Sequence, residues 1–203
     1  ALAEAGNQVD KRPVELVVLD HRGNTARSRA HLEQILKDPQ ALAVFAGLHS
    51  PPVISNLSFI NENEILLLDP WAAAGPITRY ADGPNWIFRL SVDDSKVGHV
   101  IVRRAVEERG LLKLALLLEN TGWGKSNLEV VSRALLEWGL EPATVQWFDW
   151  GLGPAGASIL VRNVRESGAD AIYLVSNTPE GVELIRAMLE LGPAYHLPII
   201  SHW

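Results

Sequence analysis

The sequence predicts an α/β protein of two lobes, each a parallel sheet flanked by helices. Short apolar runs alternate with segments of helical apolar spacing along nearly all of the 203 residues, and this alternation is typical of parallel sheets. The clearest unit is residues 111–141, where an apolar strand, a turn and an amphipathic helix follow one another. One segment rich in proline and glycine, residues 76–93, interrupts the alternation. We therefore place the boundary between the two lobes there.

The strand of this unit covers residues 112–118, an apolar run broken only by Lys113. A run of this length and character suits a strand buried on both faces. The helix after it has apolar residues on one face, at Leu128, Val131, Leu135 and Trp138, and Gly139 is a typical stop. The turn between strand and helix, residues 120–122, lies at the carboxyl end of the strand. In open α/β sheets ligands bind at that end.

Before the break, the same criteria predict three strands and two helices. The apolar run VELVVLD is followed by the turn residues Gly23 and Asn24, Asp38 and Pro39 end the first helix, and Pro51 and Pro52 suit the first turn of the second. The predicted strands are residues 14–20, 41–46 and 64–68, and the predicted helices are residues 25–37 and 51–63.

The alternation resumes within the segment that interrupts it, at residue 85, and continues to the end. Ser91 to Asp94 offer helix caps, with Asp93 and Asp94 as the best candidates, before a helix with Val97, Ile101 and Ala105 on one face. The predicted strands are residues 85–90, 112–118, 142–148, 170–175 and 198–200, and the predicted helices start at residues 97, 123, 157 and 179.

Composition excludes several classes of protein. The net charge of −6 argues against a nucleic-acid binder, which needs a basic face to neutralise phosphates. Apolar runs stay short of the ~20 residues that span a bilayer, so we predict no membrane span. The chain has no cysteine, and four of its six histidines, His21, His31, His99 and His196, show no metal-ligand spacing, so we predict no metal or other cofactor. No signal peptide is visible, and the start at Ala1 without a methionine indicates a processed product.

One motif suggests a nucleotide-binding enzyme. Gly124, Lys125 and Ser126 follow a strand, as at the end of a phosphate-binding P-loop. The P-loop requires a glycine five residues before Gly124, but this chain has the carboxylate of Glu119 there. A tight turn before a helix explains the same residues. We keep the nucleotide enzyme as a remote alternative.

Six segments, taken in order, resemble one known family. They are VELVVLDHRGNTARS, AVFAGLHSPPV, ILLLDPWAAA, NWIFRLSVDDSKVGH, LALLLENTGWGKSNLEVVSRALLEWG and GADAIYLVSNTPEGVELIRAMLELG. The chain is similar along its whole length to the type I periplasmic binding proteins, in the branch of the branched-chain amino-acid binding proteins of ABC transporters. The resemblance implies lobe one at residues 1–88, a hinge crossing at 89–93 and lobe two at 94–203.

The family has a first strand before this chain's start and further crossings after its end, so the resemblance also implies a fold truncated at both ends. Such a fragment leaves sheet edges and apolar faces uncovered. We expect exposed apolar surface and a tendency to self-associate.

The resemblance implies an exported, periplasmic or extracytoplasmic solute-binding protein, not an enzyme. Such a protein closes two lobes on an amino acid or a related organic acid or amide and presents it to a membrane permease. A sensory or regulatory ligand-binding domain of the same fold is the alternative. A neighbouring permease and ATPase would favour transport, and a neighbouring kinase or regulator would favour sensing.

Carried over by position, the resemblance also implies a ligand site between the lobes. Its residues are His49, Ser50, Trp71, Ala72, Ala73, Trp123, Ser176, Asn177, His202 and Trp203. The chain departs from the amino-acid binders in two places. Ala73 stands where they carry a threonine or serine, and His202 and Trp203 stand where they place an acidic partner for the ammonium group.

Overall fold

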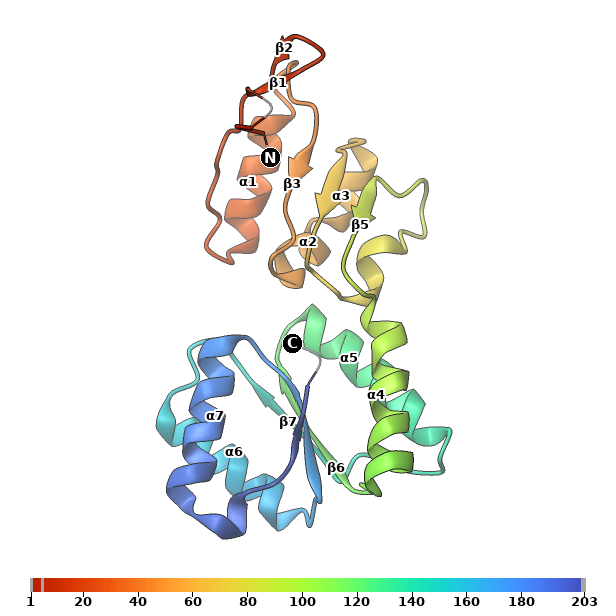
Figure 1. The fold of residues 1–203 in the computed structure, drawn as a ribbon, viewed down its shortest axis with the longest axis vertical. Coiled ribbons are helices and arrows are strands. Elements are labelled where there is room, and N and C mark those ends of the chain that lie inside the picture. The colour runs from red at the N-terminus through yellow and green to blue at the C-terminus, as the bar shows by residue number, and fades with distance from the viewer. Residues whose placement is uncertain (1, 5, 202–203) are drawn as a thin grey trace.

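The computed structural model describes residues 2–4 and 6–201, and it contains two separate parallel sheets (Figure 1). We use lobe one for the elements up to β5 and lobe two for those from α4 onward. The strands are β1 (Gln8–Val9), β2 (Arg12–Pro13), β3 (Val44–Phe45), β4 (Leu67–Asp69), β5 (Ile87–Arg89), β6 (Leu114–Glu119), β7 (Thr144–Phe148), β8 (Ala171–Val175) and β9 (Ile199–Ile200). Lobe one has the order β3-β4-β5 and lobe two the order β7-β6-β8-β9, and every pair within these sheets is parallel.

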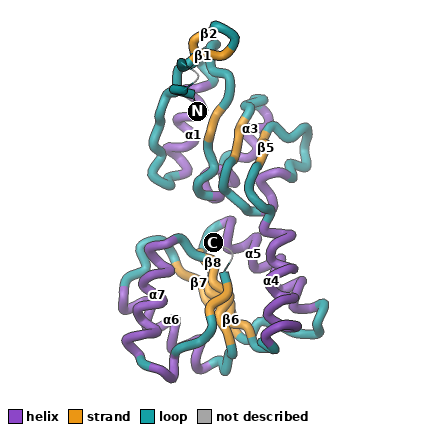
Figure 2. Tube along the Cα trace, in the orientation of Figure 1, coloured by secondary structure: helices purple, strands orange, loops and turns teal. Residues whose placement is uncertain are grey.

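Helices follow most of the strands, as the alternation predicts (Figure 2). They are α1 (Thr25–Ile35), α2 (Ser50–Ser55), α3 (Leu57–Glu62), α4 (Asp94–Arg109), α5 (Gly122–Leu136), α6 (Pro154–Glu166) and α7 (Thr178–Leu191), with the 3-10 turns η1 (Gly75–Thr78) and η2 (Pro193–Tyr195). Within the described ranges, each helix is too short or too polar to cross a membrane.

The sheet of lobe two is buried on both faces. Every residue of β6 and of β8 is buried. Side chains that alternate along β6 pack into two different apolar clusters, one shared with α4 and α5 and one shared with α6 and α7. The prediction of a strand buried on both faces is therefore confirmed for residues 114–118, whereas the strand starts two residues later than predicted and ends one residue later.

The predicted strand at residues 14–20 is not formed. Residues 14–20 have no strand assignment, and Leu16, Val17 and Val18 are exposed. An apolar run becomes a strand only where a neighbour supplies the hydrogen-bonding partner, and here a hollow of about 1830 Å³ separates this run from β3. The exposed apolar surface confirms that part of the expectation, whereas self-association stays a prediction.

Two other expectations about lobe one need correction. The single helix at residues 51–63 is two helices, α2 and α3, which meet at Asn56. The Asn56 amide donates to the carbonyls of Pro52, at 2.8 Å, and Thr25, at 3.3 Å, and this side-chain bonding competes with a continuous helix. The third strand starts at Leu67 because Glu64 has a left-handed φ of 54°, which a strand cannot contain.

Between β5 and α4 the chain passes from one lobe to the other in four residues, 90–93. Asp93 caps α4 as predicted, since its carboxylate accepts from the Ser95 amide at 2.9 Å. Asp94 is instead the first residue of α4 and is buried. The predicted start of lobe two at residue 94 coincides with the start of α4, whereas the predicted end of lobe one at residue 88 falls inside β5. The division into lobes stays a prediction.

Candidate functional site

The carboxyl ends of the two sheets face each other, and the loop after β4 lies between them. The buried carboxylate of Asp69 organises the start of this loop by accepting from the amides of Trp71, at 3.0 Å, and Ala72, at 2.8 Å. The neighbouring chain leaves room for this carboxylate only because residue 47 is a glycine. A β-carbon at Gly47 would lie 2.1 Å from Asp69 Oδ1.

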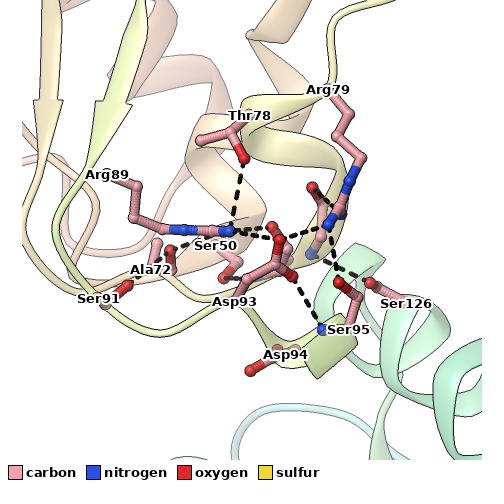
Figure 3. Close-up of polar contacts among 12 residues, drawn as sticks. Ser50, Ala72, Thr78, Arg79, Arg89, Ser91, Asp93, Asp94, Ser95 and Ser126 are labelled. Carbon is pink, nitrogen blue, oxygen red and sulfur yellow. Dashed lines mark hydrogen bonds and ion pairs between the residues drawn. The ribbon is translucent and has the colours of Figure 1, made fainter. Parts of the chain in front are cut away.

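Two serines, one from each lobe, hold the middle of the same loop (Figure 3). Ser50 of α2 accepts from the Ala74 amide at 3.3 Å, and Ser126 of α5 accepts from the Gly75 amide at 3.3 Å. Both serines are buried. The loop is thus fixed against lobe one and against lobe two.

The carbonyl groups of the loop are held by Arg89, at the end of β5 (Figure 3). Its guanidinium donates to the Ala74 carbonyl at 2.7 Å and, more weakly, to the Ala72 carbonyl at 3.4 Å. It also lies 3.0 Å from Asp93 Oδ2, which pairs with Arg79 as well. The side chain of Arg89 is 4% exposed and that of Arg79 is 49% exposed. Arg89 is therefore the buried centre of the crossing between the lobes.

The amide of Ala73 differs from its neighbours in this loop. The carbonyl of Ala73 accepts from the Asp94 amide at 3.0 Å. In the part of the chain that the structure describes, no group accepts from the Ala73 N–H. A buried amide needs a partner, so this N–H can donate to a ligand.

In lobe two, a buried carboxylate ends the central strand. Glu119 accepts from the backbone amide of Asn177, at 3.1 Å, and from its side-chain amide, at 2.6 Å. Burial raises the pKa of the Glu119 carboxyl, against hydrogen bonds from Trp150 and Asn177 that lower it, and the charge of Glu180 raises it further. Ser176 is turned toward Asn177, whose carbonyl accepts from its hydroxyl at 3.0 Å.

Trp123 is buried at the start of α5 and faces the crossing helix. Its indole N–H donates to Asp94 Oδ2 at 2.7 Å, and the Asn127 side chain donates to the same oxygen at 2.9 Å. The helix begins at Gly122, and the Gly124 amide donates to Thr121 Oγ1. Only residues 120 and 121 lie between β6 and α5. They are too few for the loop that wraps phosphates ahead of the Gly-Lys pair, so the geometry gives no support to the nucleotide alternative.

His49 meets lobe two through a residue that the sequence analysis did not single out. Its ring lies 5.6 Å from that of Trp150, centroid to centroid. Trp150 belongs to the glycine-rich loop after β7. The signal that could have found it is its position in a loop at the carboxyl end of a strand, where ligands bind in open α/β sheets.

The structure brings together part of the predicted site. Ser50, Ala72 and Ala73 lie in one hydrogen-bonded unit, and Ser176 and Asn177 lie beside Glu119 across the interface. The Trp71 side chain is half exposed. His202 and Trp203 lie outside the described residues. Ligand contacts for all ten residues stay predictions. Arg89, Glu119 and Trp150 are residues of this interface that sequence reasoning missed.

We expect Asp69 to make stability fall as the pH rises. Burial raises the pKa of its carboxyl to about 6, against the Trp71 and Ala72 amides and the charge of Arg89, which lower it. An unfolded aspartate titrates near 3.9, so the folded protein binds the proton more tightly. The free energy of unfolding that this proton contributes is lost as the pH rises through about 6. Between pH 4 and 7 the free energy of unfolding should fall by up to about 3 kcal/mol from this group.

Urea unfolding of the wild type and Asp69→Asn at both pH values measures this effect. The variant keeps an oxygen that can accept from both amides but cannot titrate. Glu119 contributes in the same direction in both proteins, so the difference between them isolates Asp69. Equal pH dependence in the two proteins would contradict the assignment.

Comparison with known proteins identifies the family. A family model described as "Periplasmic binding protein" matches residues 1–201. An "Amino acid binding protein" from Pseudomonas aeruginosa is 22% identical over 188 residues, which are 93% of this chain and 49% of that protein. The chain therefore spans about half the length of the curated relative it matches.

Solved structures share the fold at low sequence identity. A solute-binding protein of an ABC transporter from R. palustris, in complex with 4-hydroxybenzoate, has a TM-score of 0.84 and 19% identity, covering 98% of this chain and 54% of that one. A leucine-binding protein from Thermotoga maritima has a TM-score of 0.83 and 18% identity, covering 98% and 55%. With the match of the family model to nearly the whole chain, these likenesses lead to one conclusion: the chain belongs to the periplasmic binding protein family.

Proposed function

We propose that this chain is the ligand-binding part of an extracytoplasmic solute-binding protein of an ABC transporter. It holds a small organic carboxylate between its lobes and presents it to a membrane permease. Binding shifts the equilibrium between open and closed lobes by the difference in affinity for the two states. Membership of the family supports this function, and so does the arrangement of donors at the end of lobe one.

The observation that carries the proposal is the pair of donors at Ser50 and Ala73. The Ser50 oxygen already accepts from the Ala74 amide, so its proton is available to donate elsewhere. The Ala73 N–H in the same loop has no acceptor among the described residues. Two free donors at the same loop match the two oxygens of a carboxylate in number, and hydrogen bonds to an ionised acceptor are the strong ones.

The ligand class follows from the relatives and from the departures at Ala73 and at residues 202–203. The relatives named above include an amino acid binding protein, a leucine-binding protein and a protein in complex with 4-hydroxybenzoate. We propose an amino acid or an aromatic acid as the ligand. The missing hydroxyl at Ala73 reduces the polar partners for an ammonium group, which favours the acid over the amino acid.

Ser50→Ala tests the carboxylate cradle. A hydrogen bond to a charged group contributes about 1.5–3 kcal/mol, so the variant should bind its carboxylate ligand about ten to a hundred times more weakly. A thermal-shift panel on the full-length protein, with leucine, phenylalanine, benzoate and 4-hydroxybenzoate, selects the ligand. Calorimetry on the wild type and the variant then gives the affinities.

Ser55→Ala is the matched control, because Ser55 is an exposed serine at the other end of the same helix. It should bind as the wild type does. The proposal fails if no carboxylate in the panel shifts the melting temperature of the wild type, or if Ser50→Ala binds the ligand unchanged.

A further inference from the structure

We propose that Trp150 is a specificity-determining residue of the site between the lobes, a fixed aromatic wall that selects flat monocarboxylates and disfavours ligands with a second negative charge. This inference rests on the proposed function and deepens it by naming the group that recognises the far end of the ligand. It is carried by the loop that holds Trp150, by the residues that its indole meets, and by the charges behind it.

The loop that carries Trp150 is fixed on both sides. Before it, Asp149 accepts from the Asn120 side chain at 3.0 Å. After it, the Gly151 amide donates to Glu180 at 2.8 Å, and Glu180 is buried. A side chain whose neighbours are both anchored loses little freedom when a ligand binds, which is the condition for a preorganised contact.

The Trp150 indole reaches from lobe two to lobe one. Its ring is tilted by 56° to that of His49, with the centroids 5.6 Å apart. A β-carbon at Gly23 would lie 2.5 Å from Trp150 Cζ3, so the absence of a side chain at that position admits the indole. Within lobe two, the indole lies close enough to Glu119 to lower the pKa of that carboxyl. The indole thus stands between the loops of both lobes.

The surroundings of Trp150 favour a flat and uncharged group. The side chain is 41% exposed, so part of its surface remains for a ligand. Aromatic rings stack or meet edge to face with such a surface and gain about 0.5–1.5 kcal/mol beyond the buried area.

The charges behind the indole disfavour a second anion. Glu119 and Glu180 are both buried, and each raises the cost of any further negative charge beside them. The single carboxylate of the ligand belongs at Ser50 and Ala73, and its opposite end meets Trp150.

Calorimetric titration of the full-length protein with benzoate and terephthalate tests this assignment. Terephthalate is benzoate with a second carboxylate opposite the first. We expect the wild type to bind benzoate more tightly, Trp150→Ala to weaken benzoate binding about tenfold, and Trp150→Phe to weaken it less. Glu119→Gln, which removes a negative charge at nearly constant volume, should reduce the preference for benzoate over terephthalate.

Trp138→Ala is the matched control. Trp138 is also 41% exposed, but it follows the carboxyl end of α5, away from the interface, and its loss should leave both affinities unchanged. Melting temperatures verify that every variant is folded. If benzoate binds the wild type and Trp150→Ala equally well, the role of Trp150 is wrong while the proposed function stands. If no monocarboxylate binds the wild type, the role of Trp150 and the proposed function are both wrong.

Discussion

Replacing Arg89 with methionine is expected to lower the free energy of unfolding by about 3 kcal/mol. The guanidinium is buried, bonds to the Ala74 carbonyl at 2.7 Å and lies 3.0 Å from Asp93. Methionine fills a similar volume without these donors. Removing one partner of a buried ion pair costs about 3–5 kcal/mol, and the lower end applies here because Asp93 keeps Arg79 as a second partner.

Arg79→Met is the control for this prediction, because Arg79 pairs with the same carboxylate oxygen from a side chain that is half exposed. An exposed pair contributes about 0–1 kcal/mol. Urea unfolding of the wild type and both variants gives the two values, provided that the slope with urea stays constant. Equal losses of unfolding free energy in the two variants would show that the burial of Arg89 does not increase its contribution to stability. The Arg89 variant should also bind ligand more weakly, because the loop at residues 72–74 loses the group that holds its carbonyls.

Asp94→Ala is expected to destabilise the protein by a similar amount, about 3 kcal/mol. The change removes the shared acceptor of two buried donors, the Trp123 indole at 2.7 Å and the Asn127 side chain at 2.9 Å. Each buried donor that loses its acceptor costs about 1–3 kcal/mol. Asp94→Asn keeps one carbonyl oxygen at the same place, so it should lose less.

Urea unfolding measures the loss in both Asp94 variants, and near-ultraviolet circular dichroism reports the environment of the tryptophans. Asp82→Ala, at an exposed carboxylate, should change stability by less than about 0.5 kcal/mol. A result for Asp94→Ala within that same range would show that the buried bonds to Trp123 and Asn127 contribute nothing net.

The sequence predicted those elements whose pattern is local. The run at residues 112–118 and the helix after it carry their own periodicity, and the structure places β6 and α5 there. The run at residues 14–20 has equally strong apolar character, but its state depends on a partner elsewhere in space. The break at Asn56 could not be predicted from the local pattern either, because the side-chain hydrogen bond to Thr25 joins residues 31 positions apart.

The candidate site shows the same division. Ser50 and Ala73 were found through the resemblance to the family, which places them by their position in short segments of the chain. Arg89 was not, because its partners are the carbonyls of a loop 15 to 17 residues earlier, and nothing in an arginine's neighbours along the chain reveals such contacts. Glu119 entered the sequence analysis only as the residue that stands where a P-loop requires a glycine. Its burial against Asn177 depends on how β6 and β8 pair.

The short crossing between β5 and α4 can act as a hinge between the two lobes. Arg89, Asp93 and Asp94 lie at the pivot, where a rotation of one lobe displaces atoms by small amounts. The contact between His49 and Trp150 lies farther from the crossing. The same rotation therefore moves these two side chains apart by a larger distance. In the opening that the proposed function requires, contacts at the crossing would persist and set the direction of the motion, while contacts in the loops would break and set how far the equilibrium favours the closed form.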